Sequence, residues 1–300
     1  MTKAGNVFNF IDGLLPDIND VTITVPSELQ FLYAGIGMPS LRILEVAQAC
    51  QVDDYQCIKA ANPVRRITDA DEFRAYYTAL RAAALMEDED ALNDLGWLWL
   101  NGRWVPADYS HARSAFKLAA SLGSAEALFN LGAQSSYGKG AKIDLNLAIG
   151  FFELAYEQGI ICAAEALGSL YENGGDDLVV DSQLATEWYL RGAQYGGVHG
   201  GMECLFSVGR LALDNTSKTF DVSRGLYWLQ YAAMKGHCMS AELLADFYRT
   251  ALEMPDPEQR LYAFWRDHAI RLGSSWASEM KMEDETPKLY VVKRTSGVDD

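Results

Sequence analysis

The four histidines are the first side chains to test for chemistry, because imidazole serves both as a metal ligand and as a general base. They are His111, His199, His237 and His268, and they are scattered along the chain. None stands at metal-ligand spacing from a cysteine or a carboxylate. The pattern predicts structural or surface roles for all four histidines, and it predicts no metal site.

The five cysteines are the next candidates, since a thiolate is a strong nucleophile. Their odd number and irregular spacing do not fit a disulfide framework. Cys162, Cys204 and Cys238 take small-residue positions in the expected helices, which favours packing over catalysis. No serine, cysteine or lysine nucleophile stands out, so we predict that the protein is not an enzyme and binds no cofactor.

Three short stretches resemble ligand loops only in part. YGKGAK (137–142) is rich in glycine and lysine, but it lacks the spacing and the Lys-Ser/Thr ending of a phosphate loop. The acidic stretches EDED (87–90) and DDLVVD (176–181) lack EF-hand spacing. We therefore expect all three to be solvated turns.

Charge and hydropathy narrow the classes of partner. The 300 residues carry a formal net charge of −16, and 49% of them are hydrophobic, as in a folded globular chain. Nucleic acid and anionic membranes bind basic residues, so we expect neither as a partner. No apolar run reaches membrane-spanning length, and the N-terminal stretch MTKAGNVFNFIDGLLPDIND is a poor signal peptide. These features favour a cytoplasmic protein, unless a leader has been removed.

Two markers repeat along the chain with a period of about 36 residues. The first is a small residue that ends an apolar run, in Leu95-Gly96, Leu131-Gly132, Leu167-Gly168, Val208-Gly209 and Ala245-Asp246. The second is a glycine that ends the following helix, at Gly123, Gly159, Gly196, Gly236 and Gly273. Both markers place one insertion near residues 175–200. Their agreement indicates a structural repeat.

Other residues keep the same phase and have physical roles in a helix pair. An aspartate precedes each second helix, where its carboxylate accepts hydrogen bonds from free backbone amides. Eight residues before each end glycine, a large side chain is expected to fill the space between helix pairs, and four residues later a small residue allows close approach. The aspartates are Asp108, Asp144, Asp181, Asp221 and Asp256, the eighth-residue positions are Ala115, Phe151, Trp188, Trp228 and Trp265, and the small residues are Ala119, Ala155, Gly192, Ala232 and Ala269.

This pattern resembles the Sel-one-like repeats, relatives of the tetratricopeptide repeats. Residues 163–196 match through Ala163, Leu167, Gly168, Tyr171, Gly174, Asp181, Trp188, Tyr189, Ala193 and Gly196. Residues 127–159 match through Ala127, Leu131, Gly132, Gly138, Gly140, Asp144, Ala148, Phe151 and Gly159. The resemblance implies an all-α fold, a right-handed superhelical α-solenoid of antiparallel helix pairs. The fourth and fifth copies depart from the pattern in their loops.

The repeats suggest four regions. We expect an irregular N-terminal cap or partner-binding arm over 1–39, in which VTITV (21–25) alternates like a short strand. A degenerate first repeat follows over 40–89, with helices expected within 40–50, 53–61 and 69–86. Five repeats fill 90–274. A partly disordered acidic tail covers 275–300.

Polar residues on the first helix of each repeat would line the concave surface that solenoids present to partners. Trp97 and Trp104 lack a repeat-phased role, so they either anchor a partner or pack against the N-terminal cap. The candidate protein-binding residues are Asn93, Asp94, Trp97, Trp104, Asn130, Gln134, Ser169, Glu172, Arg210 and Arg249.

Three functions fit these features. The first is a non-enzymatic scaffold or adaptor, a monomer or weak homodimer, that binds a partner protein on the solenoid surface. The second is a bacterial immunity or inhibitor protein that neutralises a cognate toxin, since some members of the family do so and acidic charge suits a basic toxin. The third is a regulatory or ligand-binding subunit of an enzyme complex.

Overall fold

The structure is a computed structural model that describes residues 15–26, 36–40, 67, 69–196, 200–250 and 260–285. These residues form twelve helices, and among them there is no strand. The chain divides into two compact units, residues 1–207 and 208–300, and the boundary falls within helix α13 (Gly201–Leu213). Each unit is described by itself.

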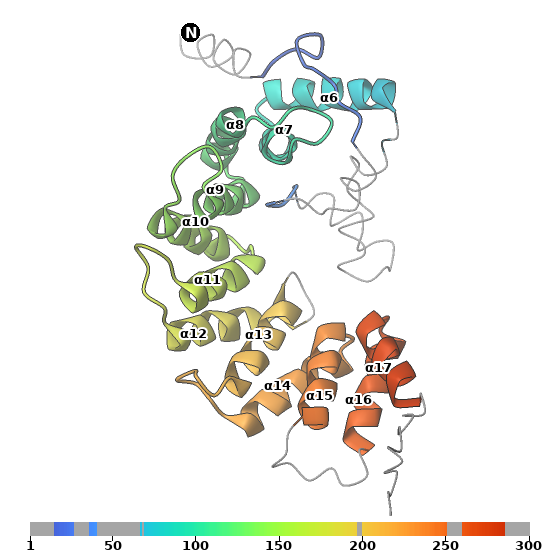
Figure 1. Cartoon of the computed structure of the whole chain (residues 1–300). Coiled ribbons are helices and arrows are strands. Elements are labelled where there is room, and N and C mark those ends of the chain that lie inside the picture. Colours follow the sequence, from blue (N-terminus) through green and yellow to red (C-terminus); the bar gives the residue numbers. More distant parts are fainter. Residues whose placement is uncertain are drawn as a thin grey trace, which may run out of the picture. The chain divides into compact units, whose positions relative to one another are not determined.

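In the first unit, each helix from α6 to α11 contacts the next one along the chain (Figure 1). α7 also contacts α9, so the first helices of successive repeats lie side by side. The bounds are α6 (Ala70–Leu85), α7 (Glu89–Asn101), α8 (Tyr109–Leu122), α9 (Ala125–Tyr137), α10 (Leu145–Glu157), α11 (Cys162–Asn173) and α12 (Ser182–Ala193). The fold is an all-α solenoid.

The second unit continues the same pattern of paired helices. α14 contacts α15, α15 contacts α16, and α16 contacts α17. The bounds are α14 (Val222–Met234), α15 (Cys238–Thr250), α16 (Arg260–Arg271) and α17 (Ser275–Glu285).

The expected helix signals act as predicted wherever the structure describes them. Asp108, Asp144, Asp181 and Asp221 each cap a helix, their carboxylates accepting hydrogen bonds from first-turn amides. The five end glycines all have positive φ, a conformation that glycine adopts without a steric penalty. Asp256 lies outside the described residues.

The small residue of each first helix receives a ring or a leucine from the second helix. A Cβ on Gly96 would lie 2.7 Å from Phe116, and one on Gly132 would lie 2.7 Å from Phe152. Tyr189 occupies the corresponding place beside Gly168. The side chain that fills this space stands seven residues before the end glycine, one position after the residues expected to fill the gap between helix pairs. One residue turns a side chain about 100° around a helix, so the two positions face different neighbours.

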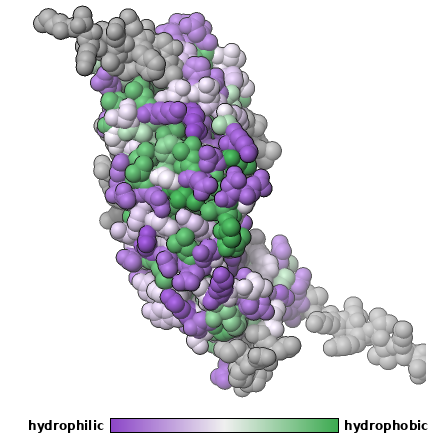
Figure 2. Space-filling view, turned by 90° about the vertical axis from the view of Figure 1, so that its left-hand side faces the viewer, coloured by the Kyte–Doolittle hydropathy of each residue, from purple (hydrophilic) through white to green (hydrophobic). Residues whose placement is uncertain are grey.

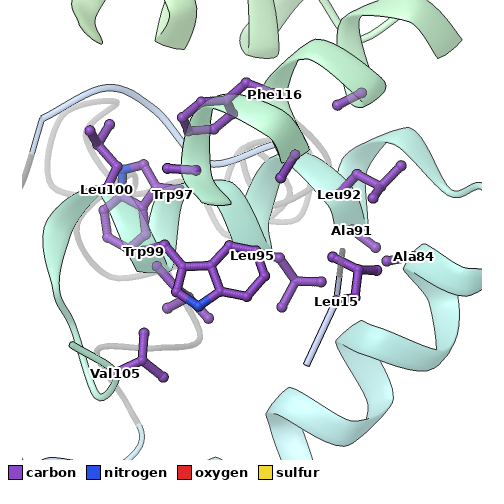
Figure 3. Close-up of a cluster of buried hydrophobic side chains, with 14 of the residues drawn as sticks. Leu15, Ala84, Ala91, Leu92, Leu95, Trp97, Trp99, Leu100, Val105 and Phe116 are labelled. Carbon is purple, nitrogen blue, oxygen red and sulfur yellow. The ribbon is translucent and has the colours of Figure 1, made fainter. Parts of the chain in front are cut away.

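The core of the first unit includes part of the N-terminal segment. Figure 3 shows Leu15 beside Ala84, with Ala91 nearby, and all three side chains are buried. The Tyr77 hydroxyl donates to the Pro16 carbonyl at 3.0 Å, and the Arg81 Nε donates to the Leu15 carbonyl at 2.8 Å. Residues 15–26 thus pack against α6.

The alternation in VTITV does not produce a strand. Thr24 makes one isolated antiparallel bridge to Trp104, in which the Thr24 N–H donates to the Trp104 carbonyl at 2.8 Å. Among the described residues no strand lies beside this segment, and its pairing there is limited to the one bridge.

Several expectations fall outside the described residues. The helix expected within 53–61 does so, as does the helix expected within 40–50 apart from Ser40, which is not helical; His199 and the tail beyond residue 285 also lie outside. The helix expected over 69–86 is α6, which Asp69 caps. The division into 1–39, 40–89, 90–274 and 275–300 stays a prediction.

Candidate peptide-binding site

A row of polar side chains marks one face of α7 and α9. Asn93, Trp97 and Asn101 are four residues apart on α7, and Asn130 and Gln134 are four apart on α9, so each set shares a helix face. The row faces residues 36–40, which lie beside α9 in Figure 1 as a short blue segment and which we call the arm. Asn93, Asn101 and Asn130 of this row bind the arm, as does Asp94 next to Asn93, and we call these four residues the clamp.

Asn130 pairs with the backbone of Met38. Its Oδ1 accepts from the Met38 N–H at 2.7 Å, and its Nδ2 donates to the Met38 carbonyl at 2.9 Å. The Asn93 Nδ2 donates to the same carbonyl at 3.2 Å, and the Asn93 Oδ1 accepts from Asn130 at 2.8 Å. Both asparagines are fully buried. One amide side chain therefore satisfies both backbone groups of a single residue, as a neighbouring strand would.

Asn101 repeats this arrangement two residues earlier in the arm. Its Oδ1 accepts from the Ile36 N–H, and its Nδ2 donates to the Ile36 carbonyl at 3.0 Å. The same Nδ2 donates to the Trp97 carbonyl at 3.0 Å, which fixes the side chain on its helix. Asn101 was not among the predicted binding residues. Its position could have indicated it, because it lies eight residues after Asn93, about two helical turns further along the same face.

Asp94 binds the third alternate residue of the arm. The Ser40 N–H donates to Asp94 Oδ1 at 2.7 Å, and the Ser40 hydroxyl donates to Oδ2 at 3.2 Å. Burial raises the pKa of the Asp94 carboxyl to about 7, and the charge of Asp90 adds to the effect, while the hydrogen bonds from Ser40 oppose it. Burial and the nearby Asp94 carboxylate also raise the pKa of the Tyr76 phenol.

Gly37 stands where the arm comes closest to α9. Its φ is +74°, and a Cβ there would collide with Asn130 Oδ1. It would also lie 3.4 Å from the Leu100 side chain. Glycine is the residue that combines this backbone conformation with this approach.

Six of the ten candidate binding residues are buried rather than open to solvent. They are Asn93, Asp94, Trp97, Trp104, Asn130 and Gln134. The sequence pattern placed the polar residues of this group on an open surface, whereas packing against the N-terminal cap was one of the two roles expected for Trp97 and Trp104. Two atoms of this group, Trp97 Nε1 and Gln134 Oε1, are buried without a hydrogen-bond partner in the part of the chain that the structure describes.

The two tryptophans with no repeat-phased role pack inside the protein. The Arg103 guanidinium carbon lies 5.3 Å from the centroid of the Trp97 ring. Trp104 stacks on Phe73 with ring centroids 5.2 Å apart, and its carbonyl accepts from Thr24. Of the two roles considered for Trp104, packing against the N-terminal segment is the one its contacts favour.

The remaining four candidates do not join the clamp. Ser169 and Glu172 are half-buried on α11, where Glu172 accepts from the Tyr189 hydroxyl at 2.9 Å. Arg210 and Arg249 belong to the second unit, and Arg249 is exposed and pairs with Asp246 at 2.6 Å.

The titratable groups elsewhere are engaged in structural contacts. His111 Nδ1 lies 2.8 Å from Asp108, and His237 Nδ1 lies 2.8 Å from the Ser240 hydroxyl. Burial and the charge of Glu165 raise the pKa of the Cys204 thiol, which keeps it protonated. Within the described residues, no three His, Cys, Asp or Glu side chains are grouped to hold a metal ion.

The outer surface is less distinctive. Figure 2 shows apolar patches among hydrophilic side chains on one face. Leu147 and Leu154 are exposed on α10, and Ile143 is exposed just before that helix. Single exposed apolar residues are common on soluble proteins, so they identify no site. None of the helices that the structure describes is long and apolar enough to cross a bilayer.

Stacked helix pairs, in three of which a first-helix glycine meets a ring of the second helix, define an α-solenoid repeat protein. A family model described as Sel1 repeat matches residues 89–124, 125–160, 163–196 and 208–237. The chain therefore carries four Sel1 repeats, which confirms the resemblance read from the sequence. The matched segments end at residue 237, so the fifth copy stays a prediction.

One solved structure shares the fold, and a second is a weaker match. The crystal structure of a Sel1 repeat protein from Oxalobacter formigenes is 24% identical, with a TM-score of 0.53, and the alignment covers 70% of this chain and 84% of that one. A protective antigen of uropathogenic Escherichia coli, described as displaying an SLR fold, is 21% identical, with a TM-score of 0.39 and coverage of 79% and 65%.

A curated relative is chitin synthase regulatory factor 4 of Schizosaccharomyces pombe. It is 30% identical over 155 residues, which are 51% of this chain and 23% of that protein. The chain thus aligns with about a quarter of the length of this relative.

Proposed function

We propose that this chain is a non-enzymatic scaffold that binds a partner protein on the first helices of its repeats. One observation carries the proposal, the pairing of the Asn101 and Asn130 amides with both backbone groups of Ile36 and Met38. Side chains that satisfy a peptide backbone in this way are suited to recognising protein segments. Sel1 repeats suggest the same class of function.

A regulatory role in an enzyme complex is the second candidate. It is favoured by the curated relative, whose name describes a regulatory factor of chitin synthase. In that case the bound partner is an enzyme or one of its assembly factors, and the scaffold changes the partner's activity or location.

An inhibitor of a basic toxin is the remaining candidate. The net charge of −16 favours a basic partner, because complementary charge speeds encounter. The comparisons add nothing specific to a toxin. We place the protein in the cytoplasm, as a monomer or weak homodimer, for each of these functions.

Affinity capture at low salt tests the proposal, followed by titration of each purified captured protein against the full chain. We expect saturable binding that weakens as salt rises, because part of the attraction is electrostatic. Ser169→Arg on α11 should weaken binding about tenfold or more by obstructing the first-helix face. Asn146→Arg is the control, since Asn146 is exposed on α10.

Two results would contradict the scaffold. One is the absence of any purified protein that binds saturably. The other is turnover of a substrate by the chain alone, which would show that it is an enzyme. Light scattering on the free chain tests the oligomeric state.

A further inference from the structure

The arm is bound as a peptide ligand is bound. Its alternate residues Ile36, Met38 and Ser40 each give a backbone N–H to one side chain of the clamp. The carbonyl oxygens of Ile36 and Met38 also accept hydrogen bonds from Asn101 and Asn130, respectively. Alternation with a period of two is the signature of an extended chain.

The contacts along α7 show that the arm runs antiparallel to this helix. Ile36 is held at Asn101 and Ser40 at Asp94, seven helical residues apart. Seven residues of helix span about 10 Å, which is less than the roughly 13 Å that four fully extended residues reach, and the left-handed backbone at Gly37 accounts for the shorter span. The clamp therefore holds a short segment that bends once, at a glycine.

We propose that α7 and α9 form a binding site for a short peptide segment of a partner protein that bends at a glycine, and that residues 36–40 occupy this site in cis when no partner is bound. This inference rests on the proposed scaffold function and specifies how the partner is held. The arm is the resting occupant, and the partner segment replaces it.

The contacts of the arm define the chemistry that the site accepts. The position over Asn130 requires glycine, because a Cβ would collide with Asn130 Oδ1. The position at Asp94 favours serine or threonine, since the carboxylate accepts from both the N–H and the hydroxyl of Ser40. An acidic residue there would be repelled.

Proline fits the position between Met38 and Ser40. Pro39 has no N–H to lose, and it restricts the preceding residue to extended conformations, which suits the pairing of Met38 with Asn130. The preferred segment is therefore apolar–Gly–any residue–Pro–Ser/Thr, where the first position follows the packing of Ile36 against the core.

Because the arm occupies the site, any partner segment must compete with it. A segment tethered to the same chain competes at high effective concentration, so a free peptide binds only to the fraction of molecules whose arm has left. A change that weakens the arm without touching the clamp should raise the affinity for a free peptide.

The test uses a fluorescent peptide that spans residues 33–43 and three full-length chains. These are the wild type, Gly37→Ala, and Gly37→Ala combined with Asn130→Ala. Gly37→Ala should displace the arm, so its affinity for the peptide should exceed that of the wild type about tenfold or more. Adding Asn130→Ala should reverse the gain. A peptide with alanine at position 37 should bind Gly37→Ala about tenfold more weakly than the glycine peptide.

Circular dichroism establishes that each variant is folded. If Gly37→Ala does not fold, Ser40→Ala weakens the arm more mildly and takes its place. Hydrogen exchange on the wild type adds a measurement without mutation, since excess peptide should increase exchange in residues 36–40.

Three outcomes would overturn the inference. One is equal peptide affinity for the wild type and a folded arm variant. Another is peptide binding that Asn130→Ala leaves unchanged. The third is a dimer that the peptide dissociates, which would mean that the arm binds a second copy. A purified partner that binds the wild type and Asn130→Ala equally would remove this inference and leave the scaffold function standing.

Discussion

The Asn130 side chain hydrogen-bonds both the N–H and the carbonyl of Met38, which lies 92 residues earlier in the chain. The contact is neutral and is directed at the backbone, so it does not depend on the methionine side chain. It is also sheltered, because Asn130 is fully buried. A hydrogen bond in a buried site contributes more to specificity than an exposed one, since losing either partner leaves a polar group unsatisfied.

Replacing Asn130 with alanine should therefore lower the stability of the first unit. The change removes the hydrogen bonds that Asn130 makes with the N–H and the carbonyl of Met38, and it removes the donor to the Asn93 side-chain oxygen. We expect a loss of about 1–3 kcal/mol in the free energy of unfolding, measured by urea denaturation. Asn146→Ala, on the exposed face of α10, is the control and should change stability by less than about 0.5 kcal/mol. Equal effects of the two variants would mean that the arm contact contributes little.

The buried Asp94 carboxyl should make stability depend on pH. Its pKa is raised to about 7 from an ordinary value of 3.8, so between these pH values the folded chain holds a proton that the unfolded chain has released. Stability should therefore fall as pH rises from 4 to 7, by at most about 1.4 kcal/mol per pH unit from this group. Asp94→Asn should remove that part of the slope, as measured by urea denaturation at several pH values. An unchanged slope would show that Asp94 does not titrate in this range.

The contact between Gly132 and Phe152 should tolerate no added methyl group. Gly132→Ala places a Cβ 2.7 Å from the Phe152 ring, which we expect to cost about 1–3 kcal/mol. Gly150→Ala is a matched control on α10, where a Cβ would meet nothing within 4 Å. This control should stabilise the protein by up to about 1 kcal/mol, because alanine favours helix over glycine. Thermal unfolding of the two variants should shift in opposite directions.

Cys204 should be protected from thiol reagents in the folded protein. Its side chain is fully buried, and burial with the nearby Glu165 raises its pKa. We expect labelling at least about a hundredfold slower than after unfolding, since the thiol reacts only through local opening. Peptide mapping by mass spectrometry resolves it from the other cysteines. Rapid labelling in the native state would contradict the packing role assigned to it.

The repeat itself was predictable from the sequence because its signals are local. An aspartate cap such as Asp144, an end glycine such as Gly159 and a small residue such as Gly132 act on chain within about two turns of themselves. Periodic recurrence then separates these signals from chance. What the period did not resolve was rotation about the helix, which decides between Phe151 and Phe152 as the ring facing Gly132.

The candidate site was only half predictable. Asn93, Asp94 and Asn130 were identified as polar residues outside the packing phase, and the structure groups them. Asn101 was missed, and residues 36–39 were expected only as part of the irregular N-terminal cap or partner-binding arm. Nothing in a segment without helix or strand periodicity indicates which distant side chains will satisfy its backbone.

The sequence alone determined that this chain is a stack of Sel1-type helix pairs, because caps, end glycines and small residues act within one repeat. Only the tertiary structure decided that the polar row on α7 and α9 is covered. The covering segment lies 54 to 92 residues away from the side chains that hold it, and such pairings depend on the folded positions of both helices together.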